Sequence, residues 1–227
     1  MTIQIVFVGH HKKRLMESIR ALREYPVSKI ILAVGEQRSR GEEIARKVAQ
    51  EIEEEVKAVW DVEVTEVDKK DTIKAASQLV QLINAQKEDV ILNVSGSLRT
   101  FSIAAYIAAS VTESRMISSI PKYDENDEEV GIEEVVEVPI LPVHLPGKEQ
   151  MDIINAIDGE KTLDELVFKL NPDIKKDSQE FKSERSRISH HIAKLEDVGF
   201  VRRRKEGRNV KIVNTELGRI VSKMYVV

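Results

Sequence analysis

The chain has no cysteine among its 227 residues. Disulfides, thiolate metal sites and cysteine nucleophiles are therefore excluded. Aromatic residues make up only 4% of the chain, and no apolar run approaches the ~20 residues that a membrane-spanning helix needs. We accordingly expect no membrane association, no metal site and no cofactor.

Hydrophobic residues make up 41% of the sequence and charged residues 33%, a balance typical of a soluble globular protein. The first apolar run, Ile3–Val8, precedes its neighbouring charges, and no small-residue cleavage site follows it. This is not the pattern of a secretion signal, so we expect a cytoplasmic protein. From Lys148 onward there are 17 Lys and Arg against 14 Asp and Glu, while the preceding part has 18 against 25.

Apolar, β-branched segments alternate with amphipathic helical segments over the first 138 residues. The predicted strands are Ile3–Val8, Lys29–Val34, Val62–Val67, Asp89–Val94 and Arg115–Ser119. The predicted helices are Lys12–Glu24, Glu42–Lys57, Thr72–Ala85 and Leu98–Val111. Glu133–Val138 is expected as an edge strand paired with Ile120–Tyr123. Near-continuous apolar strands between helices predict an α/β, Rossmann-like, mostly parallel sheet with helices on both faces.

Residues 139–147 contain three prolines, which remove backbone donors and predict an interdomain linker. Residues 148–227 then read as a second domain. Its predicted helices are Lys148–Ile157, Leu163–Leu170, Phe181–Val198 and Thr215–Tyr225, with a hairpin around Glu206-Gly207. Asn171–Ser183 is expected to be a polar connector, and Ile188, Ile192, Leu195 and Val198 are expected on one apolar face. Thr162 with Glu165 forms a predicted capping box.

A helix followed by a basic β-hairpin is the layout of a winged helix-turn-helix, so DNA is the first partner to consider. Short hydroxyls and cations on a helix suit phosphate and base-edge contacts in the major groove. On the helix the candidate DNA-binding residues are Arg185, Ser186, Arg187, Ser189, His190 and Lys194. On the hairpin they are Arg202, Arg203, Arg204, Lys205 and Arg208.

Ligands of a parallel α/β sheet bind outside the carboxyl ends of its strands. Two segments at such ends supply the candidate ligand-binding residues Gly9, His10, Ser95, Gly96, Ser97, Arg99 and Thr100. The second segment opens a helix, whose free N–H groups attract phosphate. It lacks the spacing of a P-loop and of the dinucleotide-binding fingerprint, which disfavours ATPase and dehydrogenase activities. A plain strand-to-helix turn is the alternative interpretation.

The first strand, the turn Asn93-Val-Ser-Gly-Ser-Leu-Arg-Thr100 and the C-terminal winged helix together resemble the CARF–HTH proteins, archaeal CRISPR-associated transcriptional regulators. The resemblance implies a Rossmann-like domain that forms a homodimer and senses a cyclic oligoadenylate, and a winged helix that binds promoter DNA. It implies ligand contacts by Ser95, Gly96, Ser97, Arg99 and Thr100, with Gly9 and His10 in the first-strand loop. Family members often carry two consecutive glycines where this chain has Gly96-Ser97.

The leading interpretation is a dimeric, ligand-responsive DNA-binding regulator without catalytic residues, whose partners are double-stranded DNA, a second copy and a cyclic oligoadenylate or another phosphate-bearing ligand. Two alternatives stay open. In one, the sensor domain cleaves the cyclic nucleotide, with Ser97, Arg99 or His10 positioning an internal 2′-hydroxyl. In the other, the winged helix binds protein, and DNA binding is absent or nearly independent of salt.

Overall fold

The computed structural model describes residues 1–22, 26–140, 145–206 and 209–223. It divides into two compact units, residues 1–143 and 144–227. Within the described residues, no helix combines the length and the apolar character that crossing a membrane would require.

The first unit is an α/β domain. Its elements are β1 (Thr2–Phe7), α1 (Lys12–Ala21), β2 (Val27–Gly35), α2 (Arg40–Val56), β3 (Asp61–Val67), α3 (Thr72–Asn84), β4 (Asp89–Asn93), α4 (Arg99–Thr112), β5 (Arg115–Tyr123) and β6 (Glu129–Glu137). The six strands form one sheet in the order β3-β2-β1-β4-β5-β6. The first five are parallel, and β6 is antiparallel to β5. The predicted Rossmann-like sheet is confirmed.

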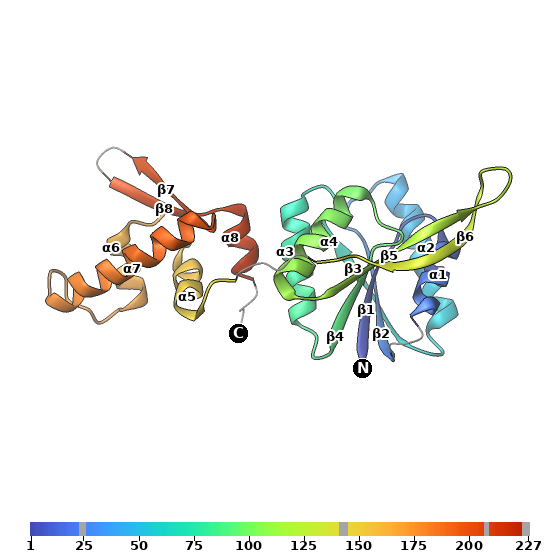
Figure 1. The fold of residues 1–227 in the computed structure, drawn as a ribbon, viewed down its shortest axis with the longest axis horizontal. Helices are drawn as coiled ribbons and strands as arrows, with labels where there is room; N and C mark the ends of the chain where they lie inside the picture. The colour runs from blue at the N-terminus through green and yellow to red at the C-terminus, as the bar shows by residue number, and fades with distance from the viewer. Residues whose placement is uncertain (23–25, 141–144, 207–208, 224–227) are drawn as a thin grey trace. The chain divides into compact units, whose positions relative to one another are not determined.

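Helices cover both faces of this sheet (Figure 1). Helices α1 and α2 bury an apolar cluster against β1 and β2, in which Leu15, Ile19 and Ile52 are fully enclosed. Helices α3 and α4 pack against each other on the other face. Small residues of α4, among them Ala104, Ala105 and Ala108, are completely buried and allow this close packing.

The edge hairpin extends beyond the body of the sheet (Figure 1). Strand β6 pairs with β5 in a register that sets Tyr123 opposite Glu129 and Ile120 opposite Glu134. The expected pairing across the acidic turn is therefore confirmed, with both strands longer than the sequence indicated. On the inner side of the hairpin, the backbone N–H of Ile132 donates to the Glu17 carboxylate of α1 at 2.7 Å.

The second unit is a winged helix domain. Its elements are α5 (Lys148–Ala156), α6 (Leu163–Leu170), α7 (Gln179–Asp197), β7 (Val201–Glu206), β8 (Asn209–Asn214) and α8 (Glu216–Val221). Strands β7 and β8 form an antiparallel hairpin, the wing. The capping box at α6 is present, because Thr162 Oγ1 accepts from Glu165 N and Glu165 accepts from Thr162 N.

Two predictions for this unit are corrected. Helix α7 begins at Gln179, two residues earlier than expected, because Ser178 caps it and accepts a hydrogen bond from Phe181 N at 3.0 Å. Val198 does not belong to the apolar face: it caps the C-terminus of α7 and is 57% exposed. The buried positions of α7 are instead Phe181, Ile188, Ile192 and Leu195.

Several predicted features lie outside the described residues. They are Glu24 at the predicted end of the first helix, part of the 139–147 linker, Gly207 at the tip of the wing, Arg208, and Tyr225 at the predicted end of the last helix.

Candidate ligand-binding and DNA-binding sites

The strand order of the first unit reverses between β1 and β4. Strands β2 and β3 extend the sheet on one side of β1, and β5 and β6 extend it beyond β4. At this switch the loops after two neighbouring parallel strands diverge to opposite faces, which opens a crevice at the carboxyl edge. Val6 of β1 pairs with Asn93 of β4, so the segments that start at Gly9 and Ser95 meet at the same edge.

The two loops touch through their glycines. A Cβ at Gly9 would collide with the carbonyl oxygen of Gly96. A Cβ at Gly96 would lie 2.7 Å from Leu15 Cδ2 and 2.8 Å from the Phe7 carbonyl oxygen. Glycine is required at both positions because backbone approaches backbone there.

Ser95 is buried between these loops. It is 7% exposed, and its hydroxyl has no hydrogen-bond partner within the described part of the chain. Its backbone N–H donates to Asn93 Oδ1 at 3.2 Å. A buried hydroxyl without a partner is costly, which makes Ser95 a candidate group for contact with a ligand at this edge.

Helix α4 begins next to this hydroxyl without a side-chain cap. Its N-cap residue is Leu98, whose side chain has no hydrogen-bond acceptor. Arg99 and Thr100 are exposed in the first turn. The first N–H groups of a helix carry partial positive charge and need acceptors. The Ser97 hydroxyl has a partner in its own loop, since it donates to the Leu98 carbonyl at 2.9 Å. The arrangement of Ser95, Arg99 and Thr100 suits an anion.

His10 is directed toward a different loop. Its Nε2 lies 2.9 Å from the Gly41 carbonyl oxygen at the start of α2, and the ring is exposed. The structure thus brings Gly9, Ser95 and Gly96 together and places Arg99 and Thr100 on the adjoining helical turn. His10 contacts the neighbouring loop after β2.

Sequence reasoning missed three residues at this edge. Asn93 is fully buried, and its amide donates to Gln4 Oε1 at 3.2 Å and Ser18 Oγ at 3.0 Å while its oxygen holds Ser95 N. An asparagine ending an apolar strand is a usable signal. Lys69 and Glu42 form a buried ion pair at 3.1 Å. They are separated by 27 positions in a lysine- and glutamate-rich chain, so no local pattern marks them.

Asp68 organises the loop after β3. Burial by itself would raise the pKa of this carboxyl, but hydrogen bonds from the backbone N–H groups of Asp71 and Lys70 and from Lys74 and Gln37 lower its pKa far below the ordinary value. Asp68 therefore stays ionised and fixes the turn that leads into α3.

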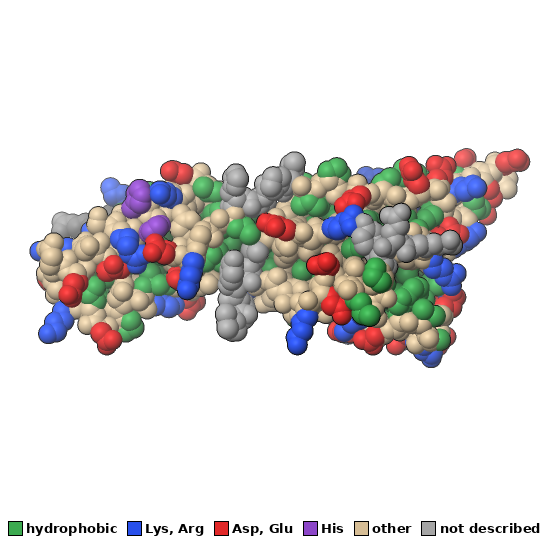
Figure 2. Space-filling view, turned by 60° about the horizontal axis from the view of Figure 1, so that its bottom comes forward, with side chains coloured by type: hydrophobic (Ala, Val, Ile, Leu, Met, Phe, Trp, Pro, Cys, Tyr) green, Lys and Arg blue, Asp and Glu red, His purple; other side chains and the backbone are tan. Residues whose placement is uncertain are grey.

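One face of α7 forms a shallow hollow beside the wing. The residues that line it are Lys182, Arg185, Ser186, Ser189, His190, Ala193 and Arg203. Five of them were predicted DNA-binding residues. In Figure 2 both basic and acidic side chains lie beside the histidines of this unit.

Arg187 and Lys194 lie on another flank of α7. Arg187 pairs with Glu184 at 2.8 Å and with Glu149 of α5 at 3.2 Å. Lys194 lines a separate depression with Pro146 and Phe200. Arg187 and Lys194, both predicted DNA-binding residues, therefore do not line the hollow beside the wing.

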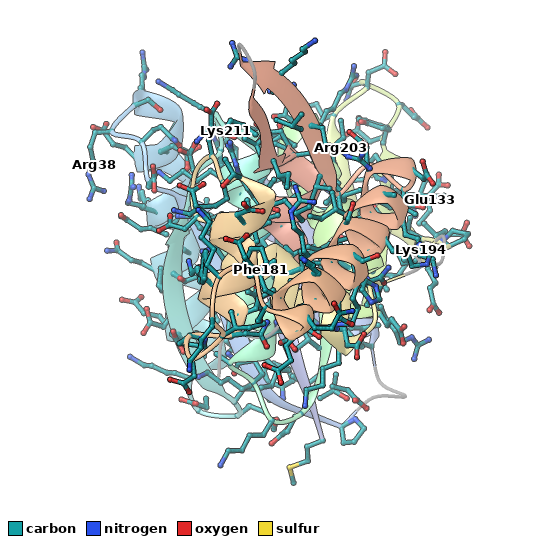
Figure 3. All side chains as sticks on the ribbon, turned by 90° about the vertical axis from the view of Figure 1, so that its left-hand side faces the viewer. Arg38, Glu133, Phe181, Lys194, Arg203 and Lys211 are labelled. Carbon is teal, nitrogen blue, oxygen red and sulfur yellow. The ribbon has the colours of Figure 1, made fainter. Side chains whose placement is uncertain are left out.

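Three arginines of the hollow and wing have an acidic partner in their own unit. Arg185 pairs with Asp164 at 2.7 Å, and Arg203, labelled in Figure 3, pairs with Glu196 at 2.9 Å. Arg204 lies 3.7 Å from Glu160. Exposed pairs of this kind are worth only ~0–1 kcal/mol, so these carboxylates hold the guanidinium groups weakly.

Comparisons with known proteins locate matches in both units. Residues 2–124 match the family described as "HFX_2341_N:-like, N-terminal". Residues 148–225 match the "DUF6293 C-terminal winged helix domain". Over 229 residues the chain is 21% identical to an uncharacterized protein of Archaeoglobus fulgidus, and the match covers 98% of both chains.

Two solved structures are also similar, and this chain spans less than two thirds of the length of each. Can2 from Sulfobacillus thermosulfidooxidans, in complex with cyclic tetra-adenylate, has a TM-score of 0.42 and 12% identity, covering 98% of this chain and 64% of that chain. Csm6 from Enterococcus italicus, bound to cyclic hexa-2′-fluoro-hexa-dAMP, has a TM-score of 0.46 and 11% identity, covering 87% of this chain and 56% of that chain.

The first matched segment spans more than half of the chain and lies within the α/β unit, ending before β6, and the second lies within the winged helix unit. The chain therefore belongs to the "HFX_2341_N:-like, N-terminal" family and joins that domain to a DUF6293-type winged helix, an arrangement consistent with the CARF–HTH resemblance.

Proposed function

We propose that this protein is a ligand-sensing transcriptional regulator that binds double-stranded DNA through its winged helix. The observation that carries the proposal is the joining, in one chain, of an uncapped helix start at the sheet's switch point with a cationic hollow between α7 and the wing. The first accepts an anion, and the second matches the phosphate backbone of DNA.

For the ligand, we propose a cyclic oligoadenylate. Its phosphates would accept hydrogen bonds from Ser95 Oγ and the first turn of α4, and Arg99 would add positive charge. Among phosphate-bearing ligands, we choose this one because the loop Asn93–Thr100 resembles the CARF motif. The chemistry of the site supports an anion more generally.

We further propose that a second copy of the chain completes the site. Two large apolar side chains, Leu98 and Ile103, are 56% and 55% exposed beside the ligand loop. Burial of such side chains against a second copy is favourable at roughly 25 cal/mol per Å². A ring-shaped ligand across a twofold axis would then contact both α4 helices, and its preference for one dimer arrangement would shift the spacing of the winged helices.

The first experiment is calorimetric titration of the full chain with cyclic tetra-adenylate, cyclic hexa-adenylate and linear controls. We expect binding of one ligand per dimer, reduced at least tenfold by Arg99→Ala. Arg20→Ala is the matched control, because Arg20 is an exposed arginine at the far end of α1. No heat with any compound, from a folded protein, would remove the sensor proposal.

The DNA-binding part is tested separately by fluorescence anisotropy with duplex DNA at increasing salt. We expect the logarithm of the affinity to fall linearly with the logarithm of the salt concentration, with a slope that reports the phosphates contacted. An affinity that does not depend on salt would favour a protein-binding role for the winged helix.

The dimer interface is tested with Ile103→Glu, which places a charge on the exposed apolar surface of α4. A variant that remains dimeric would contradict the proposed interface.

A further inference from the structure

The ammonium group of Lys69 is buried at the carboxyl edge of the sheet. The side chain is only 6% exposed. Its Nζ donates to the Val8 carbonyl oxygen at 3.2 Å and to Glu42 Oε2 at 3.1 Å. Lys69 follows β3, Val8 follows β1, and Glu42 lies in the first turn of α2. One buried cation therefore connects three segments at the edge where the ligand is proposed to bind.

The same ammonium faces the first turn of α4. It lies 5.5 Å from the centre of the Phe101 ring, and Phe101 is the third residue of that helix. Phe101 is fixed in turn by an edge-to-face contact with Phe7, with ring centres 4.6 Å apart. The positive charge is thus held against the helical turn that carries Arg99 and Thr100, and next to the residue that precedes Gly9.

Glu42 is the counterion of this group. It is 12% exposed, and its Oε2 also accepts a hydrogen bond from Gly35 N at 2.8 Å. Burial lowers the pKa of Lys69, and nearby Arg46 lowers it further, while Glu42 acts in the opposite direction. Arg46 has other partners: it pairs with Glu66 at 3.1 Å and donates to the Gln37 carbonyl at 3.3 Å.

A buried ion pair is weak grounds for stability, because removing two charges from water costs about as much as their attraction returns. This cation lies beside the Phe101 ring in the first turn of α4, a helix start that has no side-chain cap, and we assign it a second use. We propose that Lys69 is a further anion-binding residue of the ligand site, which supplies buried positive charge to a phosphate at the first turn of α4, and that Glu42 is the competing counterion that limits the affinity.

This inference rests on the proposed function and makes predictions of opposite sign for the two partners. Lys69→Met removes positive charge, and we expect it to weaken anion binding about tenfold, because charges in a poorly hydrated site interact strongly. Glu42→Gln removes the competing charge but keeps an oxygen that accepts from Gly35 N, and we expect it to strengthen binding several-fold. A purely structural ion pair predicts that both variants weaken binding, since either substitution breaks it.

The test is calorimetry on the full chain with cyclic tetra-adenylate, with cyclic hexa-adenylate and, separately, with inorganic pyrophosphate. Lys69→Arg keeps the charge and is expected to retain most of the affinity. The matched controls are Lys29→Met and Glu63→Gln, which change the same charges in a more exposed pair, 2.7 Å apart, and are expected to alter binding less than twofold. Circular dichroism establishes that each variant is folded.

The outcomes separate the two proposals. Opposite changes in Lys69→Met and Glu42→Gln support the inference, and equal or same-sign changes overturn it. A wild-type protein that binds pyrophosphate but neither cyclic tetra-adenylate nor cyclic hexa-adenylate refutes the proposed ligand and leaves Lys69 to be judged on pyrophosphate. A wild-type protein that binds none of the three compounds refutes both proposals. If Lys69→Met does not fold, Glu42→Gln and Lys69→Arg still decide the matter.

Discussion

Gly9 and Gly96 meet backbone to backbone at the switch in strand order, with no room for a side chain on either. A Cβ on Gly96 would lie 3.0 Å from the Gly9 nitrogen, and a Cβ on Gly9 would overlap the Gly96 carbonyl oxygen. The loops after β1 and β4 are therefore held at one separation, which also sets the position of Ser95 and the start of α4.

Gly9→Ala tests this contact. The added methyl must displace backbone, which costs about 1–3 kcal/mol in a packed site, and we expect ligand binding to weaken as the two loops separate. The measurement is urea unfolding followed by fluorescence of Trp60, the single tryptophan, which packs in the first unit.

Gly41→Ala is the control for that experiment. Its Cβ would meet only His10 atoms at 3.7 Å or more, and alanine is favoured over glycine within a helix. We expect unchanged or slightly higher stability. Equal losses in the two variants would contradict the close contact between Gly9 and Gly96.

Asp68→Asn is expected to lower the free energy of unfolding by an amount that depends on pH. The pKa of Asp68 is depressed in the folded protein, so its ionised form contributes stability above its ordinary pKa of 3.8 that is lost as the pH falls toward the folded value. The amide replaces an acceptor with a donor facing backbone N–H groups. We expect a cost of ~1–2 kcal/mol at neutral pH.

The measurement for Asp68 is urea unfolding of both proteins at neutral and acid pH. The difference in the free energy of unfolding should shrink as the pH falls. Asp61→Asn, at an aspartate whose side chain is 74% exposed, should change little at either pH. A difference for Asp68→Asn that is independent of pH would contradict the role of its ionised form.

Arg185→Ala and Arg187→Ala distinguish the faces of α7. Both arginines have acidic partners, but only Arg185 lines the hollow beside the wing. We expect Arg185→Ala to weaken DNA binding about tenfold and to reduce the salt slope by roughly one unit. Arg187→Ala should leave both nearly unchanged. Anisotropy titrations over a range of salt decide, and equal effects would mean that DNA contacts the α5 side as well.

Asp164→Asn is expected to strengthen DNA binding. Asp164 Oδ1 lies 2.7 Å from Arg185 Nε, and a DNA phosphate that binds Arg185 must displace this carboxylate. Because an exposed ion pair is worth at most about 1 kcal/mol, the expected gain is about two- to fivefold. Glu184→Gln removes an equivalent charge beside Arg187 and should give a smaller gain. Equal gains in affinity would mean that the loss of negative charge acts generally, and that DNA phosphate does not replace Asp164 at Arg185.

Local patterns carried much of the architecture. Near-continuous apolar runs predicted the parallel strands of the sheet, and the Thr162–Glu165 spacing predicted the start of α6. Boundaries governed by a single cap were less predictable, as at Ser178, where a side-chain hydrogen bond extends α7 into the expected connector. Val198 fits the helical period of α7 yet is exposed, because periodicity does not show where the neighbouring elements end.

The sequence by itself determined the class of each unit, since strand and helix periods, glycine turns and the basic hairpin are encoded in nearby residues. It also determined that Ser95, Gly96 and Arg99 follow a strand and open a helix. Tertiary structure alone decided that Gly9 abuts Gly96, that Lys69 and Glu42 pair beneath the same edge, and that Arg187 faces α5. These contacts join residues distant in the chain, and their partners are selected by strand order and helix packing, which no local pattern specifies.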